Sequence, residues 1–197
     1  MSGDDLNEKI DKEIVMKGET RNVIDHMAYW KHEAIIADLD AKRNNFTVVC
    51  SNLYNDFNIA TVIRNANAFL AKKVVLYGAK QYDRRGTVGT HHYTHFKHTK
   101  SLSELDDEIK SIRDTNTDVR VIGIDNIPGA SPINSYMWDS TIHYILVFGQ
   151  EQVGLPQEML DICDDILYIK QYGSVRSLNV GTASGIAMYA LVSNTVG

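Results

Sequence analysis

The sequence contains too few cysteines to build a disulfide framework or a zinc ribbon. Cys50 and Cys163 are its only two, they lie far apart, and neither has a CxxC partner. Secreted disulfide scaffolds and structural zinc sites require more cysteines at closer spacings. We therefore expect both residues to be reduced core cysteines in a cytosol-like compartment.

The sequence also lacks an export signal and a long apolar run. Its N-terminus, MSGDDLNEKIDKE, is acidic where a signal peptide would be basic and then apolar. No segment approaches the roughly 18 consecutive apolar residues of a membrane span. We expect a soluble, cytoplasmic protein with no membrane partner.

Two common nucleotide-binding fingerprints are missing as well. There is no GxxxxGK[ST] phosphate loop, and no GxGxxG follows the first apolar segment that could be a strand. Their absence argues against a nucleoside triphosphate or a dinucleotide in the usual place. A ligand held by backbone groups of several glycine-bearing loops is still compatible with the sequence.

Negative charge is scarce in the middle of the chain. The net charge is −5, yet residues 46–100 hold eight Lys/Arg against two Asp/Glu, a net charge of +6. Such a block is a plausible footprint for a phosphate backbone, although chance clustering on a solvated face is the alternative.

The hydrophobic pattern predicts alternating strands and helices. At 197 residues, the chain suits one domain with an appendage. Strands are predicted at 46–53, 73–78, 119–126, 143–150 and 165–171, and helices at 22–43, 59–71, 101–114, 156–162 and 178–192. Residues 1–45 form an N-terminal helical extension in this prediction, and residues 46–197 form an α/β domain with a mainly parallel sheet flanked by helices.

Three segments resemble the motifs of a known family. They are NLYNDFNIATVIRNANAF (52–69), LVFGQEQVGL (146–155) and YIKQYGSVRSLNVGTASGIAMYAL (168–191). Their order and separation resemble motifs 1, 2 and 3 of the SPOUT-class RNA methyltransferases, in the TrmH (SpoU) 2′-O-ribose branch. The resemblance covers about residues 46–193.

The resemblance implies a fold, a reaction and a partner. The fold would include a deep C-terminal trefoil knot, and the reaction would move a methyl group from S-adenosylmethionine (AdoMet) to a ribose 2′-hydroxyl of tRNA or rRNA. The enzyme would be a homodimer. Close passage of chain segments and cofactor would need small residues, which Gly149, Gly173, Gly181 and 183–185 supply.

The resemblance also assigns catalytic roles. Arg64 matches the catalytic arginine, and we expect it to clamp a substrate phosphate and stabilise developing negative charge. Asn58 would position Arg64 or the ribose, and Glu151 would orient Arg64 or cap backbone N–H groups. Ser177 and Asn179 would contact cofactor or substrate. There are structural alternatives to these roles. Asn58, Ser177 and Asn179 could instead cap helices, and Arg64 could form a salt bridge within its helix.

The remaining predicted contacts fall into two sets. Cofactor contacts, mostly through backbone, are expected at Gly149, Val153, Gly154, Ile169, Gly173, Ser177 and Leu178. RNA contacts are expected at Arg64, Lys80, Arg84, Arg85, His91, His92 and Lys97, most of them in a basic stretch interleaved with aromatic residues.

Two other functions compete with the methyltransferase. One is a catalytically inactive RNA-binding module of the same fold, which the intact motif residues disfavour. The other is a metal hydrolase built on the four histidines at 91, 92, 95 and 98. That cluster lacks a carboxylate or cysteine at ligand spacing, so no metal is expected.

Overall fold

The computed structural model describes residues 7–51, 56–78, 82–150 and 153–196. The chain forms two compact units, Met1–Arg43 and Asn44–Gly197. The first unit holds helix α2 (Lys12–Lys17), the 3-10 turn η1 (Asp25–Met27) and helix α3 (His32–Asp40).

The single helix predicted over residues 22–43 is wrong. The chain leaves helical geometry at Trp30, which forms an isolated antiparallel bridge with Ile10. Arg21 donates hydrogen bonds to the backbone oxygens of Ala28 (3.2 Å) and Trp30 (2.9 Å), so these carbonyls are satisfied outside a helix. Only the later part of the predicted segment, α3, is a regular helix.

The second unit is built on a parallel sheet of seven strands. Their order in the sheet is β3-β2-β1-β6-β4-β7-β5, and every pairing is parallel. The strands are β1 (Asn44–Ser51), β2 (Ala71–Tyr77), β3 (Phe96–Thr99), β4 (Val119–Ile124), β5 (Ser131–Pro132), β6 (His143–Phe148) and β7 (Asp165–Tyr168). This confirms the predicted α/β fold.

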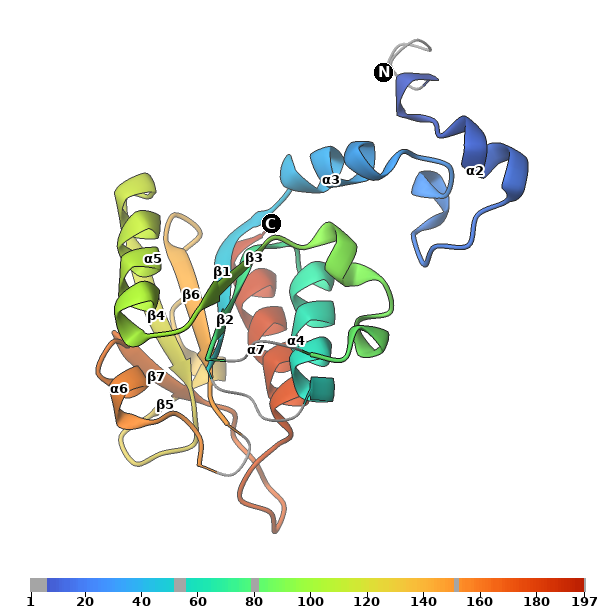
Figure 1. The fold of residues 1–197 in the computed structure, drawn as a ribbon. Coiled ribbons are helices and arrows are strands. Elements are labelled where there is room, and N and C mark those ends of the chain that lie inside the picture. Colours follow the sequence, from blue (N-terminus) through green and yellow to red (C-terminus); the bar gives the residue numbers. More distant parts are fainter. Residues whose placement is uncertain (1–6, 52–55, 79–81, 151–152, 197) are drawn as a thin grey trace. The chain divides into compact units, whose positions relative to one another are not determined.

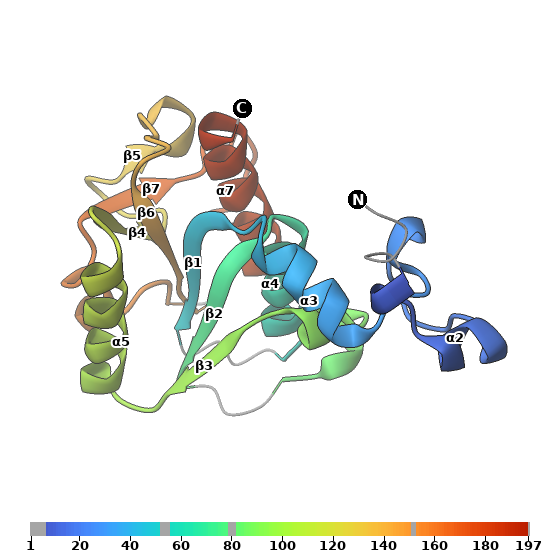
Figure 2. The ribbon, with the colours of Figure 1, turned by 90° about the horizontal axis from the view of Figure 1, so that it is seen from above.

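Helices cover both faces of this sheet (Figure 1). Helices α4 (Asp56–Ala68) and α7 (Val180–Thr195) pack on one face, and α5 (Leu102–Thr115) and α6 (Gln157–Leu160) on the other. Figure 2 shows α5 and α7 on opposite sides of the strands. Successive residues of β1 serve different layers: Val48 and Cys50 join the α4/α7 core, and Val49 joins the α5/α6 core.

The sequence pattern missed two edge strands, β3 and β5. β3 lies in the basic stretch 80–100, where the sequence pattern predicts no strand. It follows the 3-10 turns η2 (Arg84–Thr87) and η3 (Thr90–Tyr93). Three of its four residues are at least partly exposed, so it carries no apolar run. β5 has only two residues and leads into the turn η4 (Ile133–Ser135).

Neither cysteine forms a disulfide. Cys50 is buried in β1 and Cys163 is partly buried. Burial raises the pKa of each thiol to about 12. Among the described helices, none is both long and apolar enough to cross a membrane.

Candidate functional site

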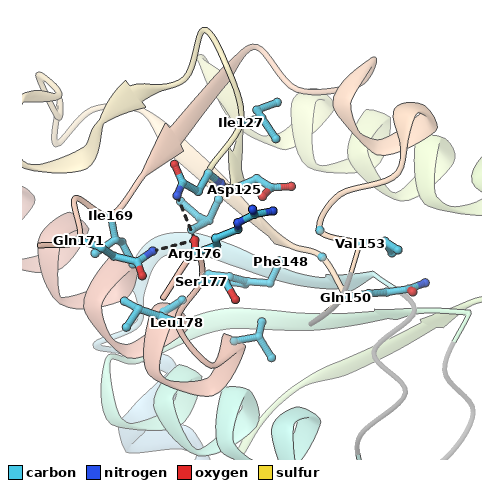
Figure 3. Close-up of a pocket in the computed structure, with 16 residues that line it drawn as sticks. Asp125, Ile127, Phe148, Gln150, Val153, Ile169, Gln171, Arg176, Ser177 and Leu178 are labelled. Carbon is cyan, nitrogen blue, oxygen red and sulfur yellow. Dashed lines mark hydrogen bonds between the residues drawn. The ribbon is translucent and has the colours of Figure 1, made fainter. Parts of the chain in front are cut away.

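A cavity of about 310 Å³ opens at the carboxyl ends of β4, β6 and β7 (Figure 3). Ligands of open parallel sheets bind at this edge. Six of the predicted cofactor-contact residues line the cavity, and Gly173 does not. Those six are Gly149, Val153, Gly154, Ile169, Ser177 and Leu178.

The loop after β6 forms one wall mainly with its backbone. Gln150 and Gly154 exchange backbone hydrogen bonds of 3.0 and 2.9 Å. Gly154 has φ of 69°, a left-handed conformation that favours glycine. A Cβ at Gly149 would lie 2.4 Å from the Gly154 carbonyl carbon, so this turn closes too tightly for any side chain there. Glu151 lies outside the described residues.

Asp125, at the end of β4, holds this loop from the opposite wall. Its carboxylate accepts the backbone N–H of Leu155 at 2.7 Å and that of Asn126 at 2.7 Å. A Cβ at Gly154 would come within 2.3 Å of Asp125 Oδ2. Sequence analysis missed Asp125, because it placed Asp125 and Asn126 inside the predicted strand 119–126, whereas β4 ends at Ile124.

The loop after β7 lies along the cavity and is tied down at Arg176. The Arg176 carbonyl accepts the side-chain N–H groups of Asn126 (3.2 Å) and Gln171 (3.5 Å), as Figure 3 shows. The exposed residues Arg176 and Ser177 both line the cavity. Among the described residues, no atom beyond the chain neighbours lies within 4 Å of a Cβ built at Gly173, so no described chain segment passes close to it.

Asn58 and Asn179 join two of the predicted motifs directly. Asn179 Nδ2 donates to Asn58 Oδ1 at 2.9 Å, and Asn179 Oδ1 caps α7 by accepting the Thr182 N–H at 3.2 Å. Asn58 is only 7% exposed. It lies inside α4, which begins at Asp56, so the alternative that Asn58 caps this helix is wrong. The residues flanking Asn179, Leu178 and Val180, line the cavity.

The small residues of α7 accommodate α4. A Cβ at Gly181 would lie 2.8 Å from Thr61 Cγ2, and one at Gly185 would lie 3.3 Å from Asn65 Nδ2. Asn65 also donates to the Gly181 carbonyl and to Ser184 Oγ, both at 2.9 Å. Sequence analysis attributed these small residues to a knot and a cofactor. Close helix packing accounts for Gly181, Ser184 and Gly185.

Arg64 lies on the exposed side of α4. Within the described ranges it makes no ion pair and no side-chain hydrogen bond, which leaves its guanidinium available to a ligand. The turn η2 packs against the same helix: a Cβ at Gly86 would lie 2.7 Å from Ala60 Cβ. The basic stretch therefore borders the helix that carries Arg64.

The other predicted RNA contacts differ in availability. Arg84 and Lys97 are exposed, whereas the exposed Arg85 forms an ion pair of 2.5 Å with Asp83. Lys80 lies outside the described residues. His91 and His92 have ring centroids 4.0 Å apart, and Thr87 Oγ1 lies 2.6 Å from His91 Nδ1.

Partial burial, then the nearby His92 and Arg84, lowers the pKa of His91. In the described part of the chain, no three His, Cys, Asp or Glu side chains gather where they could hold a metal ion. The geometry thus offers no support for the metal-hydrolase alternative.

Comparison with known proteins decides the family. A family model described as the SpoU rRNA Methylase family matches residues 45–189. The chain belongs to this family. The match covers the first two motif segments, all but the last two residues of the third, and the elements of the second unit from β1 into α7.

Individual SpoU relatives are distant. The tRNA (guanosine(18)-2′-O)-methyltransferase of Aquifex aeolicus is 24% identical over 156 residues, which cover 77% of this chain and 70% of the relative. The 23S rRNA (guanosine-2′-O-)-methyltransferase RlmB of Coxiella burnetii is 24% identical over 191 residues, covering 86% and 73%.

A solved SpoU structure shares the fold. It is the methyltransferase AviRb from Streptomyces viridochromogenes in complex with the cofactor AdoMet, with a TM-score of 0.70 and 25% identity. The alignment covers 78% of this chain and 62% of AviRb, so the chain spans less than two thirds of that protein.

Proposed function

We propose that this chain binds AdoMet in the cavity at the carboxyl ends of β4, β6 and β7 and methylates a ribose 2′-hydroxyl of a structured RNA, tRNA or rRNA. Membership of the SpoU family and the AdoMet complex of AviRb support the class of reaction. The hydrogen bond between Asn58 and Asn179 carries the proposal for this chain, because it joins the cavity wall to the helix that bears Arg64.

The groups around the cavity fit AdoMet. Apolar side chains such as Ile169 and Leu178 suit a flat base, and Asp125 and Arg176 offer charges opposite to those of an ammonium and a carboxylate. Gln171 also lines the cavity. When bound, AdoMet supplies a methyl group on a cationic sulfur, which a hydroxyl oxygen can attack.

Arg64 would bind and align the RNA. An arginine can grip a phosphate through two parallel N–H bonds, and a fixed positive charge favours loss of the proton from a nearby hydroxyl. A guanidinium already carries its proton at neutral pH and has no acceptor atom, so it cannot take the proton from the hydroxyl. We therefore assign Arg64 to positioning and charge stabilisation, with Asn58 fixing the start of its helix.

The other motif residues would act around this centre. Ser177, which is exposed and lines the cavity, would contact cofactor or ribose. Glu151 is proposed to orient Arg64, on the resemblance alone. Arg84 and Lys97 are the available cations for extending the RNA contact beyond the site. By the same resemblance, we infer a cytoplasmic homodimer with a C-terminal trefoil knot.

Methyl transfer can be measured directly. Purified protein would be incubated with methyl-labelled AdoMet and separate tRNA and rRNA pools, followed by alkaline hydrolysis, which leaves a dinucleotide wherever a 2′-hydroxyl is methylated. We expect label in one pool, and a loss of roughly a hundredfold or more for Arg64→Ala. Arg113→Ala, on the exposed surface of α5, is the matched control and should transfer normally.

A catalytically inactive RNA-binding module is the second candidate. It would bind RNA in a gel-shift assay and leave every pool unlabelled. Such a result would overturn the proposed reaction while leaving the fold and family intact.

A further inference from the structure

His91, in the turn η3, is held in one tautomer by a threonine that it contacts. Thr87 Oγ1 donates its one hydrogen to the Arg84 carbonyl at 2.7 Å. The same oxygen lies 2.6 Å from His91 Nδ1, so the hydrogen of this second contact must be on the nitrogen. A hydroxyl hydrogen turned toward the ring would leave Thr87 Oγ1 and the carbonyl oxygen facing each other as two acceptors. Nδ1 of His91 therefore donates, and Nε2 of the neutral ring is an acceptor.

The accepting nitrogen of His91 is open to solvent. The residue is partly exposed, and its Nε2 forms no hydrogen bond with any described residue. Nε2 is also not one of the buried polar atoms that lack a partner, so it reaches the surface. Because the two nitrogens of an imidazole point away from each other, Nε2 is directed away from Thr87. The chain thus presents an accepting nitrogen on a ring whose orientation is fixed from behind.

The groups around His91 keep its ring neutral. His92 stacks on it with ring centroids 4.0 Å apart, and Arg84 adds a positive charge. Partial burial, then these two groups, lowers the pKa of His91. Helix α4 packs against η2 and η3, and among its described side chains Arg64 is the only charged one, again a cation. At pH 8 the neutral ring therefore predominates, and its Nε2 lone pair does not attract a phosphate oxygen.

These turns lie where an RNA strand bound at Arg64 would pass. Figure 1 shows η2 and η3 beside α4. A Cβ at Gly86 would lie 2.7 Å from the Cβ of Ala60, which is one turn before Arg64 on α4. Arg84 and Lys97, both exposed, are available for phosphates. Next to a phosphate, an RNA strand offers two kinds of hydrogen-bond donor, the ribose 2′-hydroxyl and the base amines, and DNA lacks the first.

We propose that His91 Nε2 accepts a hydrogen bond from the RNA substrate, donated by a ribose 2′-hydroxyl or a base amine, and does not bind a phosphate. This rests on the proposed function, because it requires RNA at the basic stretch. Arg84 and Lys97 would recognise only the charge of the backbone, which is the same for every sequence. His91 would add recognition of the sugar or the base.

Binding of four labelled oligonucleotides tests the proposal without measuring methyl transfer. They are oligouridine, oligocytidine and the 2′-deoxy form of each, titrated at pH 8 by fluorescence anisotropy. His91→Phe keeps a flat ring and removes the acceptor. It should weaken binding about five- to tenfold for each probe that carries the donor, and for no other. A 2′-hydroxyl donor predicts the loss with the two ribonucleotide probes, and a base amine predicts it with the two cytosine probes.

An equal loss with all four probes, or a loss with none, would overturn the proposal, because the phosphate backbone is what all four share. His98→Phe is the matched control, since His98 is an exposed histidine of the same basic stretch, on β3. It should change binding of all four probes little.

Nitrogen NMR of the His91 ring checks the tautomer directly, even if His91→Phe failed to fold. At pH 8 the hydrogen should be on Nδ1, and a hydrogen on Nε2 would overturn the proposal. Wild-type protein that shows the expected probe dependence but transfers no methyl group would overturn the proposed function and leave the role of His91 intact. Wild-type protein that binds none of the four probes would overturn the role of His91.

Discussion

Replacing Gly149 by alanine tests whether backbone packing builds the cavity. The new Cβ would lie 2.4 Å from both the carbonyl carbon and the oxygen of Gly154, and 2.5 Å from the Leu155 nitrogen. Ordinary contacts begin near 3.4 Å, so the loop must move by about 1 Å. Every obstructing atom is backbone, so no side-chain rotation relieves the clash.

The expected cost combines two losses. Overpacking costs about 1–3 kcal/mol. Breaking the paired hydrogen bonds between Gln150 and Gly154 adds about 1–2 kcal/mol. We expect Gly149→Ala to lower the free energy of unfolding by about 2–5 kcal/mol and to weaken S-adenosylhomocysteine binding at least tenfold, measured by urea denaturation and calorimetry. Gly149 has no positive φ, so the effect is steric and not conformational.

Gly173→Ala is the matched control, because a Cβ there meets no atom within 4 Å. It should leave stability unchanged or raise it by up to about 1 kcal/mol through the unfolded chain. If Gly149→Ala matched this control in both stability and affinity, the loop would be pliable and the reasoning about its backbone would be refuted.

Two further predictions concern a loop anchor and a buried histidine. Asp125→Asn turns one of two accepting oxygens into a donor that faces a backbone N–H, and should lower the free energy of unfolding by about 1.5–3 kcal/mol in urea denaturation. The control, Asp161→Asn on the surface of the chain, should change stability little. Equal losses of stability in both variants would contradict the anchoring role of Asp125. His143 Nδ1 donates to Asn45 Oδ1 (2.9 Å), because an amide oxygen only accepts, and Nε2 of the neutral ring accepts from Thr47 Oγ1 (3.0 Å). Burial, then the charges of Lys72 and Lys73, lowers its pKa to about 4. Near pH 5 the unfolded chain binds a proton at this histidine and the folded protein does not. The free energy of unfolding should therefore fall by about 2 kcal/mol between pH 7 and pH 5. That slope should shrink in His143→Gln, and an unchanged slope would show that other groups cause it.

The central strands were predictable because each is a short apolar run. Strands buried on both faces consist mostly of apolar residues, and the segments that became β1, β2, β4, β6 and β7 each contain an apolar run. β3 escaped because Lys97 and His98 are exposed at a sheet edge, where pairing to β2 does not require apolar side chains. Its existence depends on a neighbour distant in sequence, which local pattern does not encode.

Site residues were predictable where a sequence motif includes a particular side chain. They were less predictable where tertiary packing determines the role of the residue. Asn58 and Asn179 were identified from motifs and prove to be hydrogen-bonded across 121 positions of sequence. The role of Asp125 was not predicted, because its partners are the backbone N–H groups of Leu155 and Asn126. Residues of almost any type carry such a group, so the sequence does not reveal the contact. Gly173 has no close neighbour among the described residues, since glycine in a sequence does not reveal whether space or flexibility is needed, and its predicted cofactor contact stays a prediction.

The arrangement of α4 and α7 explains how two distant motifs can act together. Asn179 both caps α7 and bonds Asn58, while Asn65 fixes α4 to the Gly181 carbonyl about two turns further along α4. Two anchor points on one helix resist both sliding and rotation, and the glycine at 181 brings the backbones close enough for both bonds to form. A shift of the cavity wall at Leu178 would therefore carry α4 with it. The position of Arg64 therefore depends on the cavity through hydrogen bonds between α4 and α7. Within the described ranges, Arg64 itself forms no hydrogen bond or ion pair with the residues that line the cavity.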